Sequence, residues 1–506
     1  MLPLRLATPD HFTQVREFLG QADYTEQGIC RRMGLRGLHE YLSRGENPGI
    51  AAPPDPQDAL DALLSLFLAG VAVNRDLLGG FIVGKVWESF EALDILCSVP
   101  DHPDQIYSPL ALYPVRGLYI ASDRWKSLDG FPLTNDKDYV FPAIHSLTHE
   151  FLELLTPSPC RNLLDLCSGT AVLALLASRH YAQQSWAVDI TERATHFGEF
   201  NRRLNDLVNA KVLQGNLYEP VKGMKFDRIV AHPPFVPAIE RGTIYADGGE
   251  DGEFVTRAII EELPQFLKPN GRLYCATMGI EREGEPYEQR VRQWLGEEHG
   301  AFDVVFIADR TQGPAQFAYR ATRNAKGSWE LMDQWRAHLE RLKVKNLVHG
   351  LLLIHAKESK RPAFTVQRRK GGHTGSAEIE WFRGWESTWA GRSNHDLVLQ
   401  SRPLAAAGFE MHVVLSRQNG QLAPSKYTLR VTHPFVVEYE CPSWVATLVA
   451  CCDGKVNALQ LFETGMRNRW IPSDLPVEEF ASTLGRLVSD GFLEIDGFAP
   501  PRPETR

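Results

Sequence analysis

The stretch LLDLCSGTAVLALLA, residues 163–177, decides the fold of this 506-residue chain. Its first residues are apolar enough for a buried strand, and AVLALLASR at 171–179 has the composition of a helix. A short turn with a single glycine, Gly169, joins the two. Such a turn directs backbone N–H groups and the positive end of the helix dipole toward a ligand. The stretch therefore predicts a βα unit with a ligand site at its turn.

Further strand-like segments follow at 185–190, 227–231, 271–278, 303–310 and 349–356, with helical patterns between them. Strands that alternate with helices are typical of βαβ units and of a parallel sheet. We therefore expect an α/β fold with a Rossmann-like core.

The chain is too long for one ordinary hydrophobic core, so we expect several domains. Helical spacing predicts a helical N-terminal domain at 1–110. The Rossmann-like core, with a leading β-hairpin, is expected at 111–372, and a β-rich connecting segment at 373–435. Helical patterns followed by a strand-like GFLEI predict a winged-helix-like domain at 436–506.

Composition narrows the classes of function. The net charge of −9 argues against broad, nonspecific binding of nucleic acid. The eight cysteines include no CxxC pair, so we expect reduced thiols in a cytoplasmic protein rather than a zinc ribbon or a disulfide framework. No cluster of His, Cys, Asp and Glu has ligand spacing, so no metal site is predicted. The longest apolar stretch, 59–73, contains Asp61 and is too short to span a bilayer, and no export signal is recognised.

The turn after the first strand favours one kind of cofactor. The three-glycine dinucleotide fingerprint is absent, because only Gly169 remains. S-adenosylmethionine has no phosphate, and its amino-acid end can lie over such a turn with Asp165 nearby. Asp189 ends the second strand, where a carboxylate can accept both ribose hydroxyls, or could instead only cap the next helix. Asn216, in GNLYEPV at 215–221, is a candidate for the adenine edge.

A second candidate site lies in FDRIVAHPPFVPA, residues 226–238. An apolar strand runs directly into His232, two prolines and Phe235. This arrangement is poor for continuing a strand and suited to a rigid wall beside a substrate.

Together, the segments at 163–177, 186–205, 215–235 and 245–274 resemble class I S-adenosylmethionine-dependent methyltransferases. More narrowly they resemble the small methyltransferase domain branch, which contains N5-glutamine methyltransferases of release factors and several N6-adenine and guanine-N2 RNA methyltransferases. The resemblance implies a seven-stranded core with S-adenosyl-L-methionine as cofactor. It implies cofactor contacts from Asp165, Cys167, Gly169, Thr170, Asp189, Ile190, Asn216, Leu217 and His232.

The resembled enzymes carry Asn-Pro-Pro-Tyr/Phe, in which the Asn side-chain oxygen and the first Pro carbonyl accept hydrogen bonds from a planar amino group. Pro233, Pro234 and Phe235 match this pattern, which marks them as catalytic candidates, whereas His232 replaces the asparagine. A neutral imidazole still offers one acceptor nitrogen. It could instead act as a general base near neutral pH, which would suit a hydroxyl or a basic nitrogen as methyl acceptor.

We therefore expect a methyltransferase that N-methylates a planar amino group in a protein, an RNA or a small molecule. One alternative is methylation of oxygen or of a basic nitrogen in a small metabolite, with His232 as general base. Another is a non-catalytic S-adenosylmethionine-binding or nucleic-acid-associated protein. A homodimer through the terminal domains is a further expectation. The basic segment KESKRPAFTVQRRK (357–370) is interpreted as a solvated edge hairpin, with contact to phosphates as the alternative.

Overall fold

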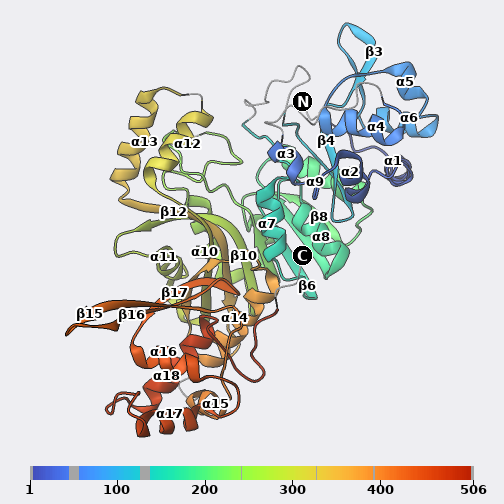
Figure 1. Ribbon diagram of the computed structural model, residues 1–506. Coiled ribbons are helices and arrows are strands. Elements are labelled where there is room, and N and C mark those ends of the chain that lie inside the picture. Colours follow the sequence, from blue (N-terminus) through green and yellow to red (C-terminus); the bar gives the residue numbers. More distant parts are fainter. Residues whose placement is uncertain are drawn as a thin grey trace. The chain divides into compact units, whose positions relative to one another are not determined.

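The computed structural model describes residues 4–44, 56–125, 137–240, 242–325, 327–390 and 394–502 (Figure 1). By its internal contacts the chain divides into two compact units. The first unit comprises Met1–Leu152, Pro157–Ile280 and Pro314–Lys345. The second comprises Glu153–Thr156, Glu281–Gly313 and Asn346–Arg506.

Five parallel strands form the main sheet of the first unit: β6 (Cys160–Leu166), β7 (Ala182–Asp189), β8 (Ala210–Gln214), β9 (Phe226–Ala231) and β10 (Leu267–Arg282). Their order is β8-β7-β6-β9-β10, so the order reverses at β6. In open α/β sheets, ligands bind at the carboxyl ends of the strands where the order reverses. The predicted Rossmann-like α/β fold is confirmed, and the ends of β6, β7 and β9 are where a site is expected.

The helices of the first unit outside its N-terminal region are α7 (Ser146–Leu154), α8 (Val172–His180), α9 (Glu192–Leu204), the 3₁₀ turn η2 (Glu219–Val221), α10 (Phe254–Phe266), α12 (Pro314–Asn324) and α13 (Trp329–Arg341). Helices α8 and α9 pack beside β7 and β8 (Figure 1). Helix α8 is buried from Val172 to Ser178 because its residues are apolar on nearly every face. Helix α9 begins after Thr191, whose side chain accepts the N–H of Ala194.

The N-terminal region belongs to the first unit. Its helices are α1 (Pro9–Gln21), α2 (Glu26–Met33), α3 (Glu40–Arg44), α4 (Ala59–Leu63), η1 (Leu64–Ala69, a π-helix), α5 (Arg75–Gly79) and α6 (Lys85–Ala92). A small antiparallel sheet is also present, formed by β1 (Val73–Asn74), β2 (Cys97–Val99) and β3 (His102–Tyr107). The leading hairpin is β4 (Ala111–Val115) and β5 (Leu118–Ser122). Phe12 of α1 packs edge-on against Phe200 of α9, with ring centroids 5.2 Å apart, so this region shares a core with the main sheet.

The longest apolar stretch forms α4 and η1, whose residues Leu63 to Leu68 are buried. This apolar stretch is therefore a buried helical segment over most of its length. Within the described ranges, no helix combines the length and the apolar character needed to cross a bilayer.

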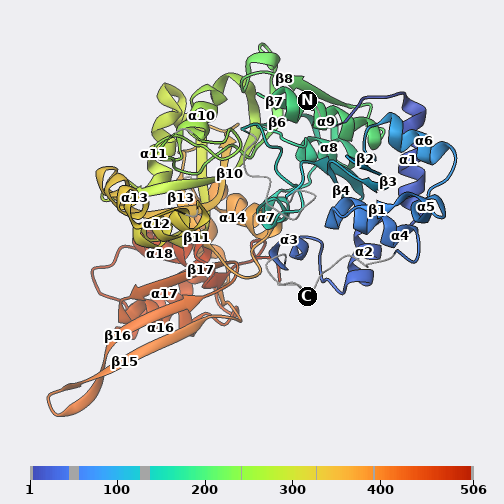
Figure 2. The same cartoon turned by 90° about the horizontal axis from the view of Figure 1, so that it is seen from above.

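The second unit contains a mixed sheet in the order β12-β11-β13-β17-β16-β15. Its strands are β11 (Phe302–Gln312), β12 (Val344–Ala356), β13 (Thr365–Lys370), β15 (Glu410–Gln418), β16 (Gln421–Val431) and β17 (Phe435–Cys441). Helix α11 (Tyr287–Trp294) and the 3₁₀ helix η3 (Gly296–Ala301) precede β11. Figure 2 shows the β15–β16 hairpin projecting beyond the helices of this unit.

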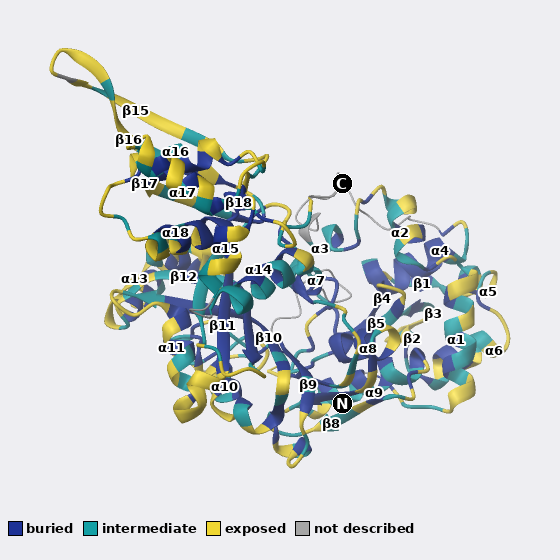
Figure 3. Cartoon of the chain, turned by 90° about the horizontal axis from the view of Figure 1, so that it is seen from below, coloured by how far each residue is buried: buried dark blue, intermediate teal, exposed yellow. Residues whose placement is uncertain are grey.

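The expectation of a β-rich segment at 373–435 is wrong for its first part, which forms α14 (Ser376–Trp389) and α15 (His395–Gln400). The reason is a helical spacing of buried residues at Ile379, Phe382 and Trp385. The C-terminal residues then form α16 (Ser443–Cys451), α17 (Ala458–Arg467), α18 (Val477–Ser489) and β18 (Leu493–Glu494), which pairs with β14 (Leu404–Ala405). The inner faces of these helices are buried (Figure 3).

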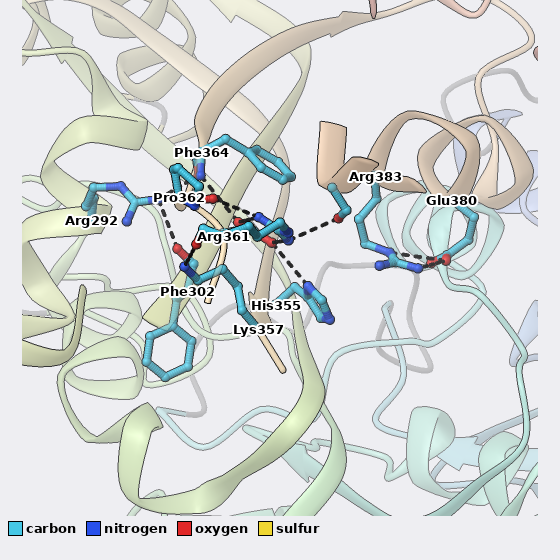
Figure 4. A network of polar contacts seen from close by, with 11 residues as sticks. Arg292, Phe302, His355, Lys357, Arg361, Pro362, Phe364, Glu380 and Arg383 are labelled. Carbon is cyan, nitrogen blue, oxygen red and sulfur yellow. Dashed lines mark hydrogen bonds and ion pairs between the residues drawn. The ribbon is translucent and has the colours of Figure 1, made fainter. Parts of the chain in front are cut away.

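The basic segment 357–370 is not an edge hairpin. Its strand β13 lies between β11 and β17, so both of its edges are paired. Arg361 forms an ion pair with fully buried Asp303, which also contacts His355 at 3.2 Å (Figure 4). Arg368 pairs with Asp490 at 2.8 Å. These arginines neutralise internal carboxylates, which argues against a role in contacting phosphates.

Candidate active site

The turn after β6 has an unusual backbone. Cys167, Gly169 and Ala171 have φ values of 54°, 51° and 62°, in the left-handed region. Residues other than glycine rarely adopt this conformation, and such strain is concentrated at functional turns. The N–H of Ala171 donates to the carbonyl of Ser168 at 2.7 Å, which closes the turn. A Cβ placed on Gly169 would meet no atom within 4 Å, so the space over the turn is open.

Buried acceptor groups face this turn without protein partners. Asp165 is fully buried, and its Oδ2 accepts the N–H of Ala174 at 3.1 Å. Among the described residues, its Oδ1 and the Oγ of Ser168 have no hydrogen-bond partner. Burial raises the pKa of Asp165, and the charge of Asp189 adds to the rise. Unsatisfied buried acceptors are costly, so these atoms fit a ligand that brings hydrogen-bond donors.

Asp189, at the end of β7, links the two neighbouring strands. Its Oδ2 accepts the N–H of Gly169 at 2.9 Å, and its Oδ1 accepts the N–H of Thr191 at 3.1 Å. Burial raises the pKa of Asp189, while these N–H donors lower it. Thr191 rather than Asp189 caps α9, so the aspartate is not simply a helix cap. Ile190, beside it, leaves 55% of its surface exposed, as an apolar ligand surface would require.

The third segment joins the same edge of the sheet. The N–H of Gly215 donates to the carbonyl of Asp189 at 2.9 Å, which brings Asn216 and Leu217 beside the end of β7. Leu217 has a φ of 47°, so it is another residue other than glycine in the left-handed region. The structure thus brings together all three segments that the sequence assigns to the cofactor.

Asn201 of α9 holds the turn after β6 in place, a role that the sequence did not reveal. It is fully buried, and its Nδ2 donates to the carbonyl of Thr170 at 3.0 Å. Its Oδ1 accepts the N–H of Ala121 at 2.7 Å, and its Nδ2 donates to the carbonyl of Ala121 at 3.0 Å. The amide therefore fixes the turn after β6 to strand β5. The sequence feature that could have identified Asn201 is the position of an asparagine on the apolar face of a predicted helix.

His232 follows β9 directly. Because Leu166 pairs with Ala231, the loops that begin at Cys167 and at His232 leave neighbouring strands at the same edge. The His232 ring stacks on Phe235, with centroids 5.8 Å apart and an interplanar angle of 12°. Burial lowers the pKa of His232 to about 4, and His145 contributes to the lowering. The imidazole is therefore neutral at neutral pH.

The glycine-rich loop YADGGEDG, residues 245–252, supports the tetrapeptide at residues 232–235. The N–H of Val236 donates to the carbonyl of Ala246 at 2.9 Å, and the N–H of Gly248 donates to the carbonyl of Val236 at 3.0 Å. Gly252 has a φ of 78°, and a Cβ there would lie 2.4 Å from the carbonyl oxygen of Phe235. The loop therefore fixes the backbone behind Phe235, which explains its glycines in structural terms.

An aromatic cluster beside this wall carries no motif in the sequence. Phe141 stacks on Tyr245 at 5.9 Å and contacts His145 at 4.9 Å between ring centroids. Phe151 of α7 packs edge-on against His232 at 5.7 Å. The loop before α7 is anchored because the N–H of Val140 donates to Asp123 at 2.8 Å.

Among the described residues, no group of three or more His, Cys, Asp and Glu side chains could hold a metal ion. The arrangement that the structure provides is a turn with open space and unsatisfied acceptors, adjacent to a wall of neutral imidazole, prolines and an aromatic ring.

Residues 143–301 match the family model described as methyltransferase small domain. The chain is 31% identical to the ribosomal protein uL3 glutamine methyltransferase of Bradyrhizobium diazoefficiens over 165 residues, which are 30% of this chain and 52% of that protein. The chain thus spans about half the length of that relative. It is 30% identical over 164 residues to a protein of Methanocaldococcus jannaschii named provisionally as a protein N5-glutamine methyltransferase, with 31% of this chain and 81% of that protein covered.

A further relative, the uL3 glutamine methyltransferase of Bordetella pertussis, is 28% identical over 268 residues, which are 49% of this chain and 85% of that protein. The family model, the relatives and the geometry of the turn agree on one kind of protein. The chain belongs to the methyltransferase small domain family of class I S-adenosylmethionine-dependent methyltransferases, and its cofactor is S-adenosylmethionine.

Proposed function

We propose that the protein methylates the side-chain amide nitrogen of a glutamine in another protein. The observation that carries the proposal is His232, a neutral imidazole stacked on Phe235 at the end of β9, beside the cofactor turn. The names of the relatives from Bradyrhizobium and Bordetella, both glutamine methyltransferases of ribosomal protein uL3, support the same class of acceptor.

The cofactor would be held by the groups at the carboxyl edge of the sheet. The unpaired oxygens of Asp165 and Ser168 would accept hydrogen bonds from its amino-acid end, and Asp189 would accept them from the ribose. The adenine would lie between Ile190 and the loop of Asn216 and Leu217. Cys167, Gly169 and Thr170 would contribute the turn itself. When bound, the cofactor supplies an electrophilic methyl group on a positively charged sulfur.

The chain itself would position the acceptor amide and surround it with polar groups. A ring nitrogen of His232 would accept an N–H of the amide, the carbonyl of Pro233 would accept the other, and Pro234 would keep the wall rigid. Phe235 would pack on the plane of the amide. After the N–CH₃ bond forms, the nitrogen must lose a proton. An N-protonated amide is a stronger acid than the hydronium ion, so the proton can pass to water and no side chain needs to act as a general base.

The lowered pKa of His232 favours this role over the alternative of a general base for a hydroxyl or a basic nitrogen. A base works best when its pKa lies near the operating pH. A pKa of about 4 is more than two units below the ordinary value for histidine, 6.5.

The test is to incubate the purified protein with labelled S-adenosylmethionine and a cell extract, and to separate protein, RNA and small molecules. We expect label in protein, at a glutamine that mass spectrometry locates. Label confined to RNA or to small molecules would contradict the proposal. A chain that binds cofactor and labels nothing would favour the non-catalytic alternative.

For the remainder of the chain, we propose that α16–α18 and β18 form a winged-helix-like module that binds the protein partner. Apolar residues exposed on the β15–β16 hairpin (Val413, Val414, Leu415 and Leu422) are compatible with a homodimer or with partner binding. The free cysteines are compatible with a cytoplasmic location. Sedimentation at several protein concentrations would separate a monomer from a dimer.

A further inference from the structure

The acceptor wall, residues 232–235, continues into an exposed apolar surface. Val236 is the next residue in the chain, and its side chain is exposed. Its N–H donates to the carbonyl of Ala246 at 2.9 Å, which brings the residues just before Ala246 close to the wall. Two of these, Ile244 and Tyr245, are large apolar residues that are also exposed.

Phe141, from the loop before α7, is exposed as well and belongs to the same surface. Its ring stacks on Tyr245, with centroids 5.9 Å apart and an interplanar angle of 22°. The N–H of Ile244 donates to the carbonyl of Lys137 at 2.9 Å, which ties the two loops together. All of these residues lie in the first unit. The name apolar platform is used below for Phe141, Val236, Ile244 and Tyr245.

The position of the apolar platform indicates what it binds. Neighbouring apolar side chains that stay exposed mark interaction sites. A glutamine in a protein reaches the acceptor wall with its chain neighbours attached, so these neighbours must lie on the surface that borders the wall. We propose that the apolar platform binds an apolar side chain next to the acceptor glutamine and thereby selects which glutamine is methylated. This inference rests on the proposed function and adds a determinant of its specificity.

The charges around the platform favour a peptide over a nucleic acid. Exposed aromatic rings can also stack on bases, but a nucleic acid brings phosphates that require Lys or Arg side chains nearby. In the described parts of these loops (137–144, 236–240 and 242–252) the charged residues are Lys137, Asp138, Glu240, Asp247, Glu250 and Asp251. Arg341 approaches the last of these loops, but it pairs with Glu250 at 3.1 Å. The surface is therefore mainly acidic and would repel phosphates.

The apolar platform is held in shape by its own contacts. Tyr245 packs against Tyr139 at 5.3 Å, in addition to its stacking on Phe141. The carboxylate of Asp247 closes the loop, because it accepts the N–H groups of Gly242 and Gly249, each at 2.8 Å. A surface that is already ordered loses little conformational entropy when it binds a partner.

The test uses the glutamine peptide recovered from the labelled protein, together with versions that carry serine at each neighbour of the glutamine in turn. Tyr245→Ser removes a ring residue of which 42% is exposed and can be covered by substrate. Covering this fraction of a large apolar side chain corresponds to a rise in KM of about three- to tenfold when the ring is lost. The changes in kcat and in the affinity for S-adenosylmethionine should be smaller. Tyr245→Phe keeps the ring and should lose less.

Tyr319→Ser, at an exposed tyrosine of α12, is the matched control and should leave KM unchanged. Ile244→Ser guards against a local collapse in the first variant, because it keeps the backbone hydrogen bond to Lys137, and it should also raise KM. In the wild type, serine at one neighbour of the glutamine should raise KM by a similar factor. The same peptide change should have little further effect in Tyr245→Ser, where the contact is already lost.

An unchanged KM in both platform variants, an equal rise in Tyr319→Ser, or fully additive effects of peptide and protein changes would overturn the inference and leave the glutamine assignment intact. Label that enters only small molecules would contradict the proposed function and the role of the platform together. Label that enters RNA, and that Tyr245→Ser reduces, would show that the rings stack on a base and that peptide binding is wrong.

Discussion

Asp189 accepts a hydrogen bond from the backbone N–H of Gly169 at 2.9 Å, so the acid that ends β7 also holds the turn that follows β6. The two residues are 20 positions apart in the sequence. One carboxylate therefore holds the turn and, in our proposal, also binds the ribose, so its replacement should affect both.

Replacing this carboxylate should weaken cofactor binding. Asp189→Ala removes a charged acceptor from the ribose and leaves the N–H of Gly169 without its partner, a loss of about 1.5–3 kcal/mol. We expect the Kd for S-adenosylmethionine to rise at least about tenfold in calorimetry. Asp189→Asn is the control that keeps one acceptor oxygen, and it should lose less. Equal affinity in the wild type and the alanine variant would rule out Asp189 as a ribose ligand.

His232→Asn restores the tetrapeptide of the resembled enzymes. If the imidazole acts as an acceptor for an amide N–H, this variant should retain substantial activity. If it is a general base, the same change should lower kcat by about 10²–10⁴. The measurement is kcat with the labelled protein substrate, with cofactor binding as the control. An inactive variant that binds cofactor normally would indicate a hydroxyl or a basic nitrogen as the methyl acceptor.

The pH profile of the wild type provides an independent check. The folded protein holds the pKa of His232 at about 4, below the usual 6.5, so the acceptor form persists as the pH falls below neutral. Activity that depends on neutral His232 is lost only when the pH approaches about 4. We therefore expect the plot of kcat/KM against pH to show no change of slope near the usual histidine pKa. A limb near that value which His232→Asn abolishes would contradict the acceptor role.

Gly252→Ala should damage the acceptor wall selectively. The new Cβ would lie 2.4 Å from the carbonyl oxygen of Phe235, at a φ of 78°. Left-handed strain costs about 1–3 kcal/mol, and the overlap adds to it. Gly223→Ala is the matched control, with a φ of 82° and no atom within 4 Å of the added Cβ.

Both variants should unfold at lower denaturant concentration than the wild type, but only Gly252→Ala should lose methyl transfer while retaining cofactor affinity. Similar activity in the two variants would show that the contact with Phe235 is unimportant.

The sequence predicts the parts of the fold that depend on local patterns. The strand, turn and helix at 163–177 are found as β6 and α8, because buried leucines and a single glycine specify them locally. The three cofactor segments meet as expected, since parallel strands bring their carboxyl ends to one edge.

Features that depend on contacts between residues far apart in the sequence could not be predicted from local patterns. The segment around Arg368 resembled an exposed basic edge, yet its partners β17 and Asp490 lie far along the chain. His145 and Phe141 carry no motif of their own. They contact each other, and Phe141 stacks on Tyr245, in a loop that Asp123 and Tyr113 anchor from earlier in the chain.

The buried amide of Asn201 has a consequence for dynamics. It joins the carbonyl of Thr170, in the cofactor turn, to both backbone groups of Ala121 in the leading hairpin. Any opening that exposes Ala121 to solvent must therefore break its hydrogen bonds with the side chain that also holds the turn. Ligand binding at the turn makes such openings rarer by mass action. The amide proton of Ala121 should accordingly exchange more slowly with deuterium when S-adenosylmethionine is present, although this residue is no ligand of the cofactor.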